Sequence, residues 1–270
     1  MNEELIQEII SIIKDKVDID FENYKINTIL RRLRQRISIL NFNSIDEYYK
    51  YFIENLDKET KILSEYFLIK TTEFFREPVY FYYFQKLAKD LISSKRNFIK
   101  ILCIGCSSGE EPYSIAMILS EKRSKNPRFD FQIDAFDVDP DTISEAKKAI
   151  YVEEALNNVP HKFIKKYFHK LGDRYKLDTT DFEKNISFYV MDIFKMKSSF
   201  QGILQYNFIF ARNIFLYIKE HQTTKLFEKI IPMLEKGGYL ILGSAELPPK
   251  KYAYFFKQIC PGIKIFKFVA

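Results

Sequence analysis

The stretch Ile-Lys-Ile-Leu-Cys-Ile-Gly-Cys-Ser-Ser-Gly-Glu-Glu-Pro-Tyr-Ser, residues 99–114, decides the fold of this chain. The apolar run that ends at Ile104 predicts a buried strand. Gly105 and Gly109 then predict a tight turn, because glycine lets the backbone bend sharply and lets a ligand approach it closely. Pro112 is typical of the first turn of a helix. The stretch therefore predicts a strand, a glycine turn and a helix, an arrangement that holds a nucleoside at the edge of an α/β sheet.

Two carboxylates follow the second glycine and indicate the kind of ligand. A phosphate site needs free N–H donors and no anion nearby, whereas Glu110 and Glu111 would repel a pyrophosphate. A ligand with hydroxyl groups and a positive charge suits such a place better. S-adenosylmethionine carries a ribose, an ammonium and a sulfonium, so we expect that cofactor in preference to NAD or ATP.

From Ile99 onward strand and helix patterns alternate, which predicts a mostly parallel sheet with helices on both faces. The expected strands are 99–104, 131–136, 186–190, 207–211, 238–243 and 263–269, with a further aromatic stretch near 253–258. Helices are expected from Pro112, from Pro140 behind an Asp139 cap, and from His221 to Leu234, where Gly237 and Gly238 would end the last one. No helix separates the last two strands, so we expect them to form an antiparallel edge.

Residues 1–70 have helix periods and no strand pattern, which predicts a small helical domain. Ser44 followed by Glu47 is typical of a capping box at the start of its third helix. On the second helix, expected over about residues 23–40, four arginines cluster: Arg31, Arg32, Arg34 and Arg36. They fit either a solvated helix face or a docking surface for an acidic helix or a phosphate backbone. We expect residues 1–70 to be followed by a linker and connecting helix at 71–98 and a sheet domain at 99–270.

Residues 151–185 interrupt the alternation within the sheet domain. A helix pattern near residues 160–167 precedes Gly172 and Asp173, which predict a hairpin turn. We therefore expect an inserted subdomain of one helix and a small β-hairpin outside the main sheet. Such an insertion fits either a partner contact or a plain elaboration of the fold.

Polar side chains follow three of the predicted strands, and the carboxyl ends of parallel strands meet at one edge of a sheet. Asp137 ends the second strand, where a carboxylate accepts hydrogen bonds from a ribose diol; its alternative role is a helix cap beside Asp139. Asp192 follows the third strand, near where an adenine amino group would lie. Arg212 and Asn213 end the fourth, apolar run, and a polar residue there must be paired or functional.

The composition indicates a soluble, cytoplasmic protein. The sequence has no run of 18 apolar residues and no signal-peptide pattern, and its three cysteines fit a reducing compartment. Cys103 and Cys106 have the spacing of a redox or metal pair, but no second ligand pair exists, so we expect no metal. The net charge of +6 favours acidic partners without indicating nucleic acid. We expect a monomer with no nucleic-acid partner and no membrane insertion.

Five motifs in a fixed order make the chain similar to a known family. They read T-x-F-F-R-E from Thr72, G-C-S-S-G-E-E-P-Y-S-I-A-M from Gly105, F-D-V-D from Phe136, F-I-F-A-R-N-I-F-L-Y from Phe208, and G-G-Y-L-I-L-G-S-A-E from Gly237. Together they resemble the chemotaxis receptor methyltransferase (CheR) family over nearly the whole chain. The resemblance implies a Rossmann-like S-adenosylmethionine methyltransferase sheet with an N-terminal all-α domain. It also implies transfer of methyl from S-adenosylmethionine to glutamate side chains on the cytoplasmic helices of chemoreceptors, which leaves S-adenosylhomocysteine.

Carried over motif by motif, the resemblance assigns a cofactor pocket and two residues that face the transferred methyl. The pocket residues would be Thr72, Arg76, Glu111, Asp137, Asp192, Ile193, Arg212 and Asn213. The two residues that face the methyl would be Arg76 and Tyr217. Two positions depart from the family pattern, since Lys70 stands where the family often has Asn, and Asp192 where Asn is common.

The acceptor explains why the motifs contain no histidine. A glutamate carboxylate, with an ordinary pKa near 4.3, is already ionised at neutral pH and needs no general base. The three histidines, His161, His169 and His221, are expected on the surface.

Two other interpretations stay open: a methyltransferase of the same fold with another acceptor, such as RNA or a small molecule, and a non-catalytic module that binds S-adenosylmethionine. A catalytically dead relative should lack Arg76 or Tyr217, and this chain has both. In part of the family the small β-subdomain binds a peptide at the carboxyl terminus of the receptor by adding a strand. The turn at residues 171–174 is short, so we expect this chain not to depend on such a tether.

Overall fold

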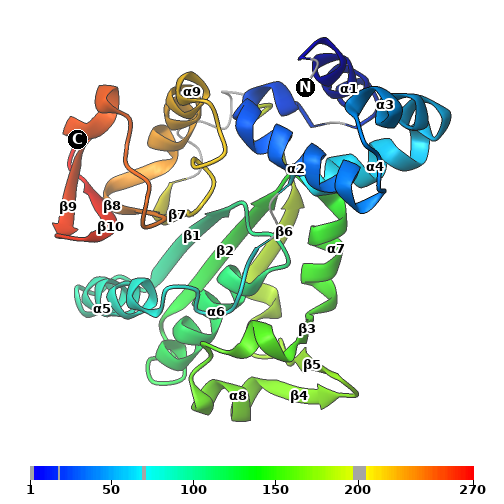
Figure 1. The fold of residues 1–270 in the computed structure, drawn as a ribbon. Helices are drawn as coiled ribbons and strands as arrows, with labels where there is room; N and C mark the ends of the chain where they lie inside the picture. The colour runs from blue at the N-terminus through cyan, green and yellow to red at the C-terminus, as the bar shows by residue number, and fades with distance from the viewer. Residues whose placement is uncertain (1–2, 18, 69–70, 197–204) are drawn as a thin grey trace. The chain divides into compact units, whose positions relative to one another are not determined.

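The computed structural model of the chain describes residues 3–17, 19–68, 71–196 and 205–270. The chain forms two compact units. One consists of residues 1–70 together with 215–223, and the other of residues 71–214 together with 224–270. Figure 1 shows the first unit as helices coloured from dark blue to cyan, and the second as a sheet with helices.

The first unit is helical, as its sequence predicts. Its described helices are α1 (Glu3–Lys16), α2 (Ile26–Ile39), α3 (Ile45–Glu54), α4 (Leu56–Phe67) and the 3₁₀-helix η1 (Phe21–Asn23). Apolar residues at helical spacing bury one face of each helix; Ile9, Ile29, Phe52 and Leu63 are fully buried. The predicted capping box of α3 is confirmed, because Ser44 Oγ accepts the N–H of Glu47 at 3.1 Å and the Glu47 carboxylate accepts the N–H of Asn43 at 3.0 Å.

The arginine cluster on α2 divides between solvent and core, which corrects the expectation that all four arginines lie on one exposed face. Arg36 is buried, and its guanidinium forms an ion pair with the fully buried carboxylate of Glu59. The hydroxyl of Tyr48 donates to the same carboxylate at 2.9 Å. A buried charge requires such partners, so Arg36 stabilises the helical unit, while Arg31 and Arg34 remain exposed.

Residues 215–223 join the helical unit through backbone hydrogen bonds. The N–H of Lys25 donates to the carbonyl of Tyr217 at 2.7 Å, and the N–H of Lys219 donates to the carbonyl of Asn23 at 2.9 Å. A single bridge pairs Tyr24 with Ile218 between these two bonds. The end of the F-I-F-A-R-N-I-F-L-Y motif therefore belongs to the helical unit.

The second unit has the predicted α/β architecture, with a seven-stranded sheet in the order β6-β2-β1-β7-β8-β10-β9. The strands are β1 (Phe98–Ile104), β2 (Asp130–Asp137), β6 (Ile186–Val190), β7 (Tyr206–Ala211), β8 (Leu234–Leu242), β9 (Phe256–Cys260) and β10 (Ile263–Phe268). The pairs among β6, β2, β1, β7 and β8 are parallel, and β10 runs antiparallel to β8 and β9. The predicted antiparallel edge is therefore confirmed.

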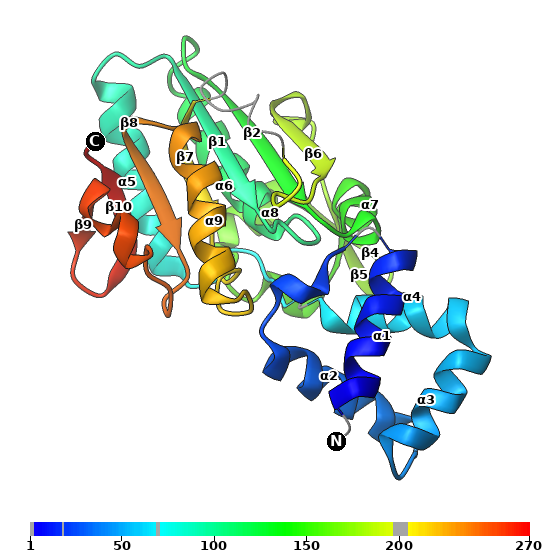
Figure 2. The ribbon, with the colours of Figure 1, turned by 90° about the horizontal axis from the view of Figure 1, so that it is seen from above.

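Helices cover both faces of this sheet. They are α5 (Pro78–Ser93), α6 (Glu110–Arg123), α7 (Pro140–Lys148) and α9 (Glu220–Ile230). Figures 1 and 2, which view the sheet from two directions, show α5 and α6 on one face and α9 on the other. The central strands β1 and β7 are mostly apolar and almost entirely buried, as expected for parallel strands between two helix layers.

Two predicted boundaries in this unit are wrong. Helix α6 begins at Glu110 and not at Pro112, because Gly109 in the left-handed conformation is its N-cap. Gly237 and Gly238 do not end a helix but lie inside β8, where the register against β7 shifts. A Cβ atom at Gly238 would lie 2.8 Å from the carbonyl oxygen of Glu235, so the chain passes too close to itself for any other residue.

The inserted residues form a second, three-stranded sheet in the order β3-β5-β4. It consists of β3 (Ile150–Val152), β4 (Phe168–Leu171) and β5 (Arg174–Leu177), all antiparallel. The 3₁₀-helix η2 (Glu153–Leu156) and the helix α8 (His161–Tyr167) precede the hairpin. The predicted helix and hairpin are present, and β3 is a third strand that the sequence pattern did not indicate.

Candidate active site

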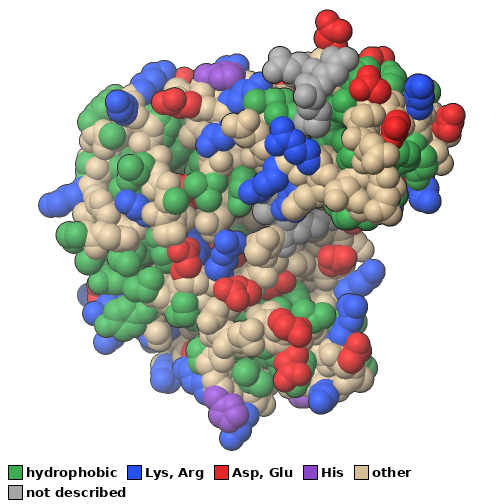
Figure 3. Space-filling view, in the orientation of Figure 1, with side chains coloured by type: hydrophobic (Ala, Val, Ile, Leu, Met, Phe, Trp, Pro, Cys, Tyr) green, Lys and Arg blue, Asp and Glu red, His purple; other side chains and the backbone are tan. Residues whose placement is uncertain are grey.

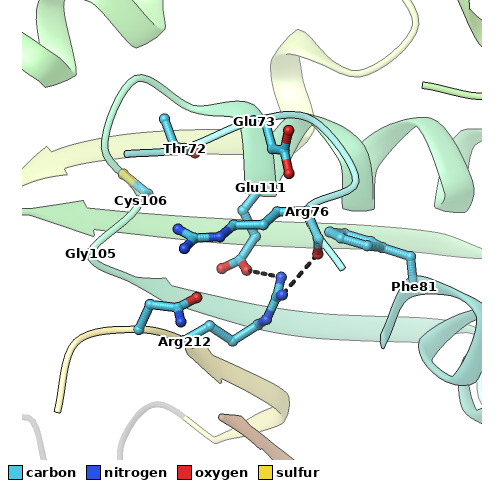
Figure 4. A pocket seen from close by; sticks show the side chains of 9 residues that line it. Thr72, Glu73, Arg76, Phe81, Gly105, Cys106, Glu111 and Arg212 are labelled. Carbon is cyan, nitrogen blue, oxygen red and sulfur yellow. Dashed lines mark hydrogen bonds and ion pairs between the residues drawn. The ribbon is translucent and has the colours of Figure 1, made fainter. Parts of the chain in front are cut away.

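A pocket lies at the carboxyl ends of β1 and β7, where the strand order reverses direction. From β1 the chain crosses to β2 on one side, and from β7 it crosses to β8 on the other. Ligands of open α/β sheets bind in the crevice at such a point. The pocket is lined by Thr72, Glu73, Arg76, Phe81, Gly105, Cys106, Glu111, Arg212 and Asn213. Figure 4 shows Arg76, Glu111 and Arg212 converging there.

The glycine turn forms one wall of the pocket. The amides of Gly105 and Cys106 both donate to the carbonyl of Phe136, at 2.8 and 3.0 Å, which pins the end of β1 against β2. Gly105 has φ +70° and Gly109 has φ +94°, conformations that favour glycine. The side chain of Ile214 lies 3.1 Å from where a Cβ of residue 105 would be, so a larger residue there would have to displace Ile214.

Arg212 is a buried cation that joins three parts of the pocket. Its guanidinium donates to the carboxylate of Glu111 at 3.0 Å, to that of Glu77 at 2.7 Å and to the carbonyl of Arg76 at 2.8 Å. It also lies 4.7 Å from the ring centre of Tyr80, close enough for a cation–π interaction. The residues of α6, of β7 and of the segment before α5 are therefore held around one charge.

The chain around Arg76 is fixed by the two phenylalanines before it, as the sequence predicts. Phe74 is fully buried and packs edge-on against Tyr151 and Phe168. Phe75 is 4% exposed, and its N–H donates to Ser114 Oγ at 3.0 Å. Arg76 itself is half-buried, and its Nη1 donates to the carbonyl of Thr71 at 2.7 Å. A guanidinium has five N–H donors, so Arg76 retains donors for an anionic group in the pocket.

Backbone strain is concentrated around this site. Phe75, Glu77, Ser107 and Asn213 all have positive φ, between 47° and 60°. Left-handed backbone at a residue other than glycine costs about 1–3 kcal/mol, and it persists where surrounding contacts over-determine it. Such strain is typical of functional sites.

Comparison with known proteins identifies the family. The family model described as "CheR methyltransferase, SAM binding domain" matches residues 70–260. The model described as "CheR methyltransferase, all-alpha domain" matches residues 4–68. The chain belongs to the CheR methyltransferase family. It is an S-adenosylmethionine-dependent methyltransferase, and the resemblance drawn from the five motifs is confirmed.

Curated relatives match the CheR chain over most of its length. A chemotaxis protein methyltransferase of Borreliella burgdorferi is 31% identical over 247 residues, which are 88% of this chain and 86% of that protein. Chemotaxis protein methyltransferase 2 of Vibrio cholerae is 29% identical, over 86% of this chain and 81% of that protein. A probable biofilm formation methyltransferase, WspC, of Pseudomonas putida is 27% identical, over 91% of this chain and 57% of that protein.

The residues around the pocket fit S-adenosylmethionine. The Nε of Arg212 is buried and, among the residues that the structure describes, has no hydrogen-bond partner. A buried donor of this kind suits an acceptor group of a ligand. Burial raises the pKa of Glu111, and the neighbouring Arg212 charge opposes that rise. A cationic ligand would stabilise the ionised form of Glu111 further.

Five of the predicted cofactor residues of this CheR chain line the pocket together: Thr72, Arg76, Glu111, Arg212 and Asn213. Of the other three, Asp137 is the last residue of β2, and Asp192 and Ile193 follow β6 along the same edge of the sheet. Tyr217 lies in the segment that joins the helical unit. Lys70, where the sequence departs from the family pattern, lies outside the described residues.

Asp137 connects the glycine turn to the next helix. One carboxylate oxygen accepts the N–H of Ser107 at 2.7 Å, and the other accepts the N–H of Asp139 at 3.0 Å. Asp139 in turn caps α7 by accepting the N–H of Asp141 at 2.9 Å. The pKa of Asp137 is raised by burial, and the backbone hydrogen bonds work against the rise. Asp139, and not Asp137, is thus the cap of α7. Each carboxylate oxygen of Asp137 keeps a second acceptor site, so these hydrogen bonds are compatible with the expected contact to a ribose.

Asp192 and Ile193 are held just after β6. Asp192 accepts the N–H of Phe194 at 2.8 Å, and Ile193 is 7% exposed. The adjacent backbone N–H of Met191 donates to the carbonyl of Asp137 at 2.7 Å, so this segment continues the pairing of β6 with β2.

Three acidic residues make contacts at the site that the sequence does not indicate. Glu110 is expected, with Glu111, to lie where a pyrophosphate would rest, whereas Glu77 and Glu246 have no expected role. Glu77 pairs with Arg212, Glu246 accepts amides at the ends of β7 and β8, and Glu110 is buried under the glycine turn. Ser108 Oγ lies 2.8 and 2.9 Å from the two carboxylate oxygens of Glu110. All three occur within the quoted motifs. Glu77 and Glu246 have a partner on another segment, whereas Ser108 lies in the same turn as Glu110.

The described residues contain neither a group of side chains that could hold a metal nor a helix that could cross a membrane. No group of three or more His, Cys, Asp or Glu side chains that could hold a metal occurs among the described residues. Within the same residues, the helices are too short or too polar to cross a membrane. The three histidines are exposed, as expected.

Proposed function

We propose that this enzyme methylates glutamate side chains on the cytoplasmic helices of chemoreceptors and produces glutamate methyl esters. The observation that carries the proposal is the convergence of Arg76, Glu111 and Arg212 at the switch point of a CheR sheet. The names of the relatives in Borreliella burgdorferi and Vibrio cholerae support a role in chemotaxis.

The reaction needs alignment more than proton transfer. When bound, S-adenosylmethionine supplies a methyl group on a cationic sulfur, which keeps the bonding electrons when the methyl leaves. The acceptor carboxylate forms the new O–C bond on the side opposite the sulfur and is already ionised at neutral pH. Holding the reacting groups in line can lower the barrier by about 7–11 kcal/mol.

We assign the following roles to the residues of this chain. Asp137 would accept hydrogen bonds from the ribose, and Glu111 would face the cationic part of the cofactor. Arg76 would hold the acceptor carboxylate, and Tyr217 would donate a hydrogen bond near the transferred methyl. Thr72, Asp192, Ile193, Arg212 and Asn213 would complete the cofactor pocket, and no residue is assigned to a metal.

The face drawn in Figure 3 favours a protein acceptor over an RNA acceptor. An RNA-binding face gathers Lys and Arg side chains around the site. On the face drawn in Figure 3, Lys and Arg side chains are interspersed with Asp and Glu side chains.

We place receptor docking on the exposed face of α2. Arg31 and Arg34 are exposed there, and a receptor region rich in glutamate would complement them. Exposed charge pairs are weak and are screened beyond about 8 Å at physiological salt. Replacing both arginines with glutamine should therefore raise the KM for receptor at low salt and leave the affinity for cofactor unchanged. Lys50→Gln with Lys58→Gln, on exposed positions of α3 and α4, is the matched control.

The test of the function is the chemistry of the product. Enzyme, S-adenosylmethionine with a labelled methyl group and a receptor cytoplasmic fragment are incubated together, and the labelled protein is then treated with mild base. A carboxyl methyl ester releases its label as methanol, whereas a methylated nitrogen does not. A base-stable label would show another acceptor, and binding of cofactor without any label on the fragment would leave the non-catalytic alternative.

A further inference from the structure

Glu246 places a carboxylate between the ends of two neighbouring strands. It is 3% exposed and follows β8, while Asn213 follows the adjacent strand β7. One oxygen, Oε2, accepts the N–H of Asn213 at 2.8 Å and the N–H of Gly243 at 2.7 Å. The N–H of Glu246 itself donates to the carbonyl of Gly243 at 2.9 Å, so a tight turn presents the carboxylate. Hydrogen bonds from backbone N–H groups to a carboxylate are among the strong ones in proteins.

The main chain at Asn213 needs such support. Asn213 has φ +60° and lines the pocket. Asparagine tolerates this left-handed conformation better than most residues, but the conformation still costs free energy. The next residue, Ile214, packs against Gly105 of the glycine turn. A change in the Asn213 backbone would therefore move both the loop after β7 and the residue that covers the turn.

Gly243 makes the close approach possible. A Cβ atom at this position would lie 2.7 Å from Nδ2 of Asn213, 2.8 Å from Oε2 of Glu246 and 2.9 Å from the backbone nitrogen of Asn213. Real Cβ atoms essentially never come this close to other heavy atoms. The close packing therefore leaves room only for glycine between Asn213 and Glu246.

We propose that Glu246 is a positioning residue, whose carboxylate fixes the left-handed backbone of Asn213 and thereby shapes the cofactor pocket. The inference rests on the proposed role of Asn213 in binding S-adenosylmethionine. Glu246 acts through Asn213 and Gly243, and it has no assigned contact with substrate or with the transferred methyl.

The experiment compares Glu246→Ala with Glu246→Gln and measures two quantities. Calorimetry gives the Kd for S-adenosylhomocysteine, and ¹H–¹⁵N NMR gives the amide shifts of Asn213 and Gly243. Loss of the acceptor in Glu246→Ala should weaken binding about 10-fold or more, and should move both amide signals upfield. Glu246→Gln keeps a carbonyl oxygen that accepts both N–H groups, so most of the affinity should return.

A matched control lies at the opposite end of the same strands. Glu235, near the start of β8, accepts from Asn207 Nδ2 of β7 and from Arg96, so it too joins neighbouring segments through a carboxylate. Glu235→Ala should lower stability without changing the Kd for S-adenosylhomocysteine. If the two alanine variants lose similar stability but only Glu246→Ala weakens binding of S-adenosylhomocysteine, the effect of Glu246 on Kd comes from positioning and not from general destabilisation.

The outcomes are distinct. A parent enzyme that does not bind S-adenosylhomocysteine refutes the proposed cofactor site itself. If the parent enzyme binds S-adenosylhomocysteine and the Glu246→Ala variant binds it equally well, the positioning role alone is refuted. If Glu246→Ala does not fold, Gly243→Ala tests the same point, since the added methyl must push Asn213 aside while the carboxylate stays; an unchanged Kd in that variant overturns the proposal.

Discussion

Glu110 should make the stability of this enzyme depend on pH near neutrality. Glu110 is 4% exposed and lies in the first turn of α6, directly after the glycine turn. Burial raises its pKa from 4.5 to about 7, although hydrogen bonds from backbone, Ser108 and Thr72 favour the ionised form. The perturbation is Glu110→Gln, which keeps the size and a carbonyl acceptor and cannot ionise.

The sign of the effect follows from proton binding. Between pH 4.5 and 7 the folded state keeps a proton on Glu110 that the unfolded state has lost, so the free energy of unfolding falls as pH rises. The contribution is fully present below pH 4.5 and is lost as pH rises through 7. At 1.36 kcal/mol per pH unit, a rise in pKa from 4.5 to about 7 corresponds to about 3 kcal/mol in total. About 2 kcal/mol of this is lost between pH 5.5 and 8.5.

The assay is urea unfolding of the parent and of Glu110→Gln at several pH values from 5.5 to 8.5. The difference in unfolding free energy between the two proteins should change by about 2 kcal/mol across this range, with the parent losing stability relative to the variant as pH rises. Glu153→Gln, at an exposed position in the same unit, is the matched control and should follow the parent. A ¹³C NMR titration of the Glu110 carboxyl should have its midpoint near 7.

Two results would refute the reasoning. Parallel pH profiles of parent and Glu110→Gln would mean that the folded state does not hold the extra proton. A carbon titration with its midpoint near 4.5 would mean that water reaches the carboxylate and that burial does not raise its pKa.

Three further predictions concern the site and its substrate. Asp137→Ala should weaken cofactor affinity by about 10- to 100-fold, since each charge-assisted hydrogen bond contributes roughly 1.5–3 kcal/mol, and calorimetry checks this; an unchanged affinity would remove Asp137 from the ribose. Arg76→Ala should sharply reduce methyl transfer while the melting temperature stays that of the parent, because Phe74 and Phe75 and not Arg76 anchor the segment; full turnover would leave Arg76 a structural cation. Removal of the last residues of a receptor fragment should not slow its methylation, because the hairpin of β4 and β5 has only four residues in each strand; a large loss of rate would show that the hairpin binds a tether.

Local patterns predicted the fold well. The alternation of strands and helices, the glycine turn, the Ser44 capping box and the antiparallel edge all depend on residues close together in sequence, and all are present. The errors also have local causes. Gly237 and Gly238 carry the signal of a helix end, but here glycine is needed because β8 bends against the carbonyls of β7.

The sequence indicated which residues gather at the site, but not which hydrogen bonds and ion pairs they form there. Five of the residues that motif matching assigned to the cofactor line one pocket. Arg212 and Asn213 reach it because strand ends meet at the switch point whatever their side chains do. Which carboxylate meets which cation depends on long-range packing. Glu246 reaches Asn213 across 33 residues and Glu77 reaches Arg212 across 135, and no local pattern specifies either pairing.

The two buried arginines make the physical reason plain. Arg36 and Arg212 each stand in a motif that suggests an outside partner, a receptor for the first and a cofactor for the second. Each instead forms ion pairs with carboxylates of this chain: Arg36 with Glu59, and Arg212 with Glu77 and Glu111. A guanidinium is always charged, so once packing buries it the fold must supply acceptors before any ligand arrives. A basic residue in a binding motif therefore gives the position of a charge. Its burial decides whether that charge pairs with carboxylates of the chain and holds the site together, or stays available to bind a partner. By that criterion half-buried Arg76 is left to bind an anion, whereas Arg212 first holds the walls of the pocket in place.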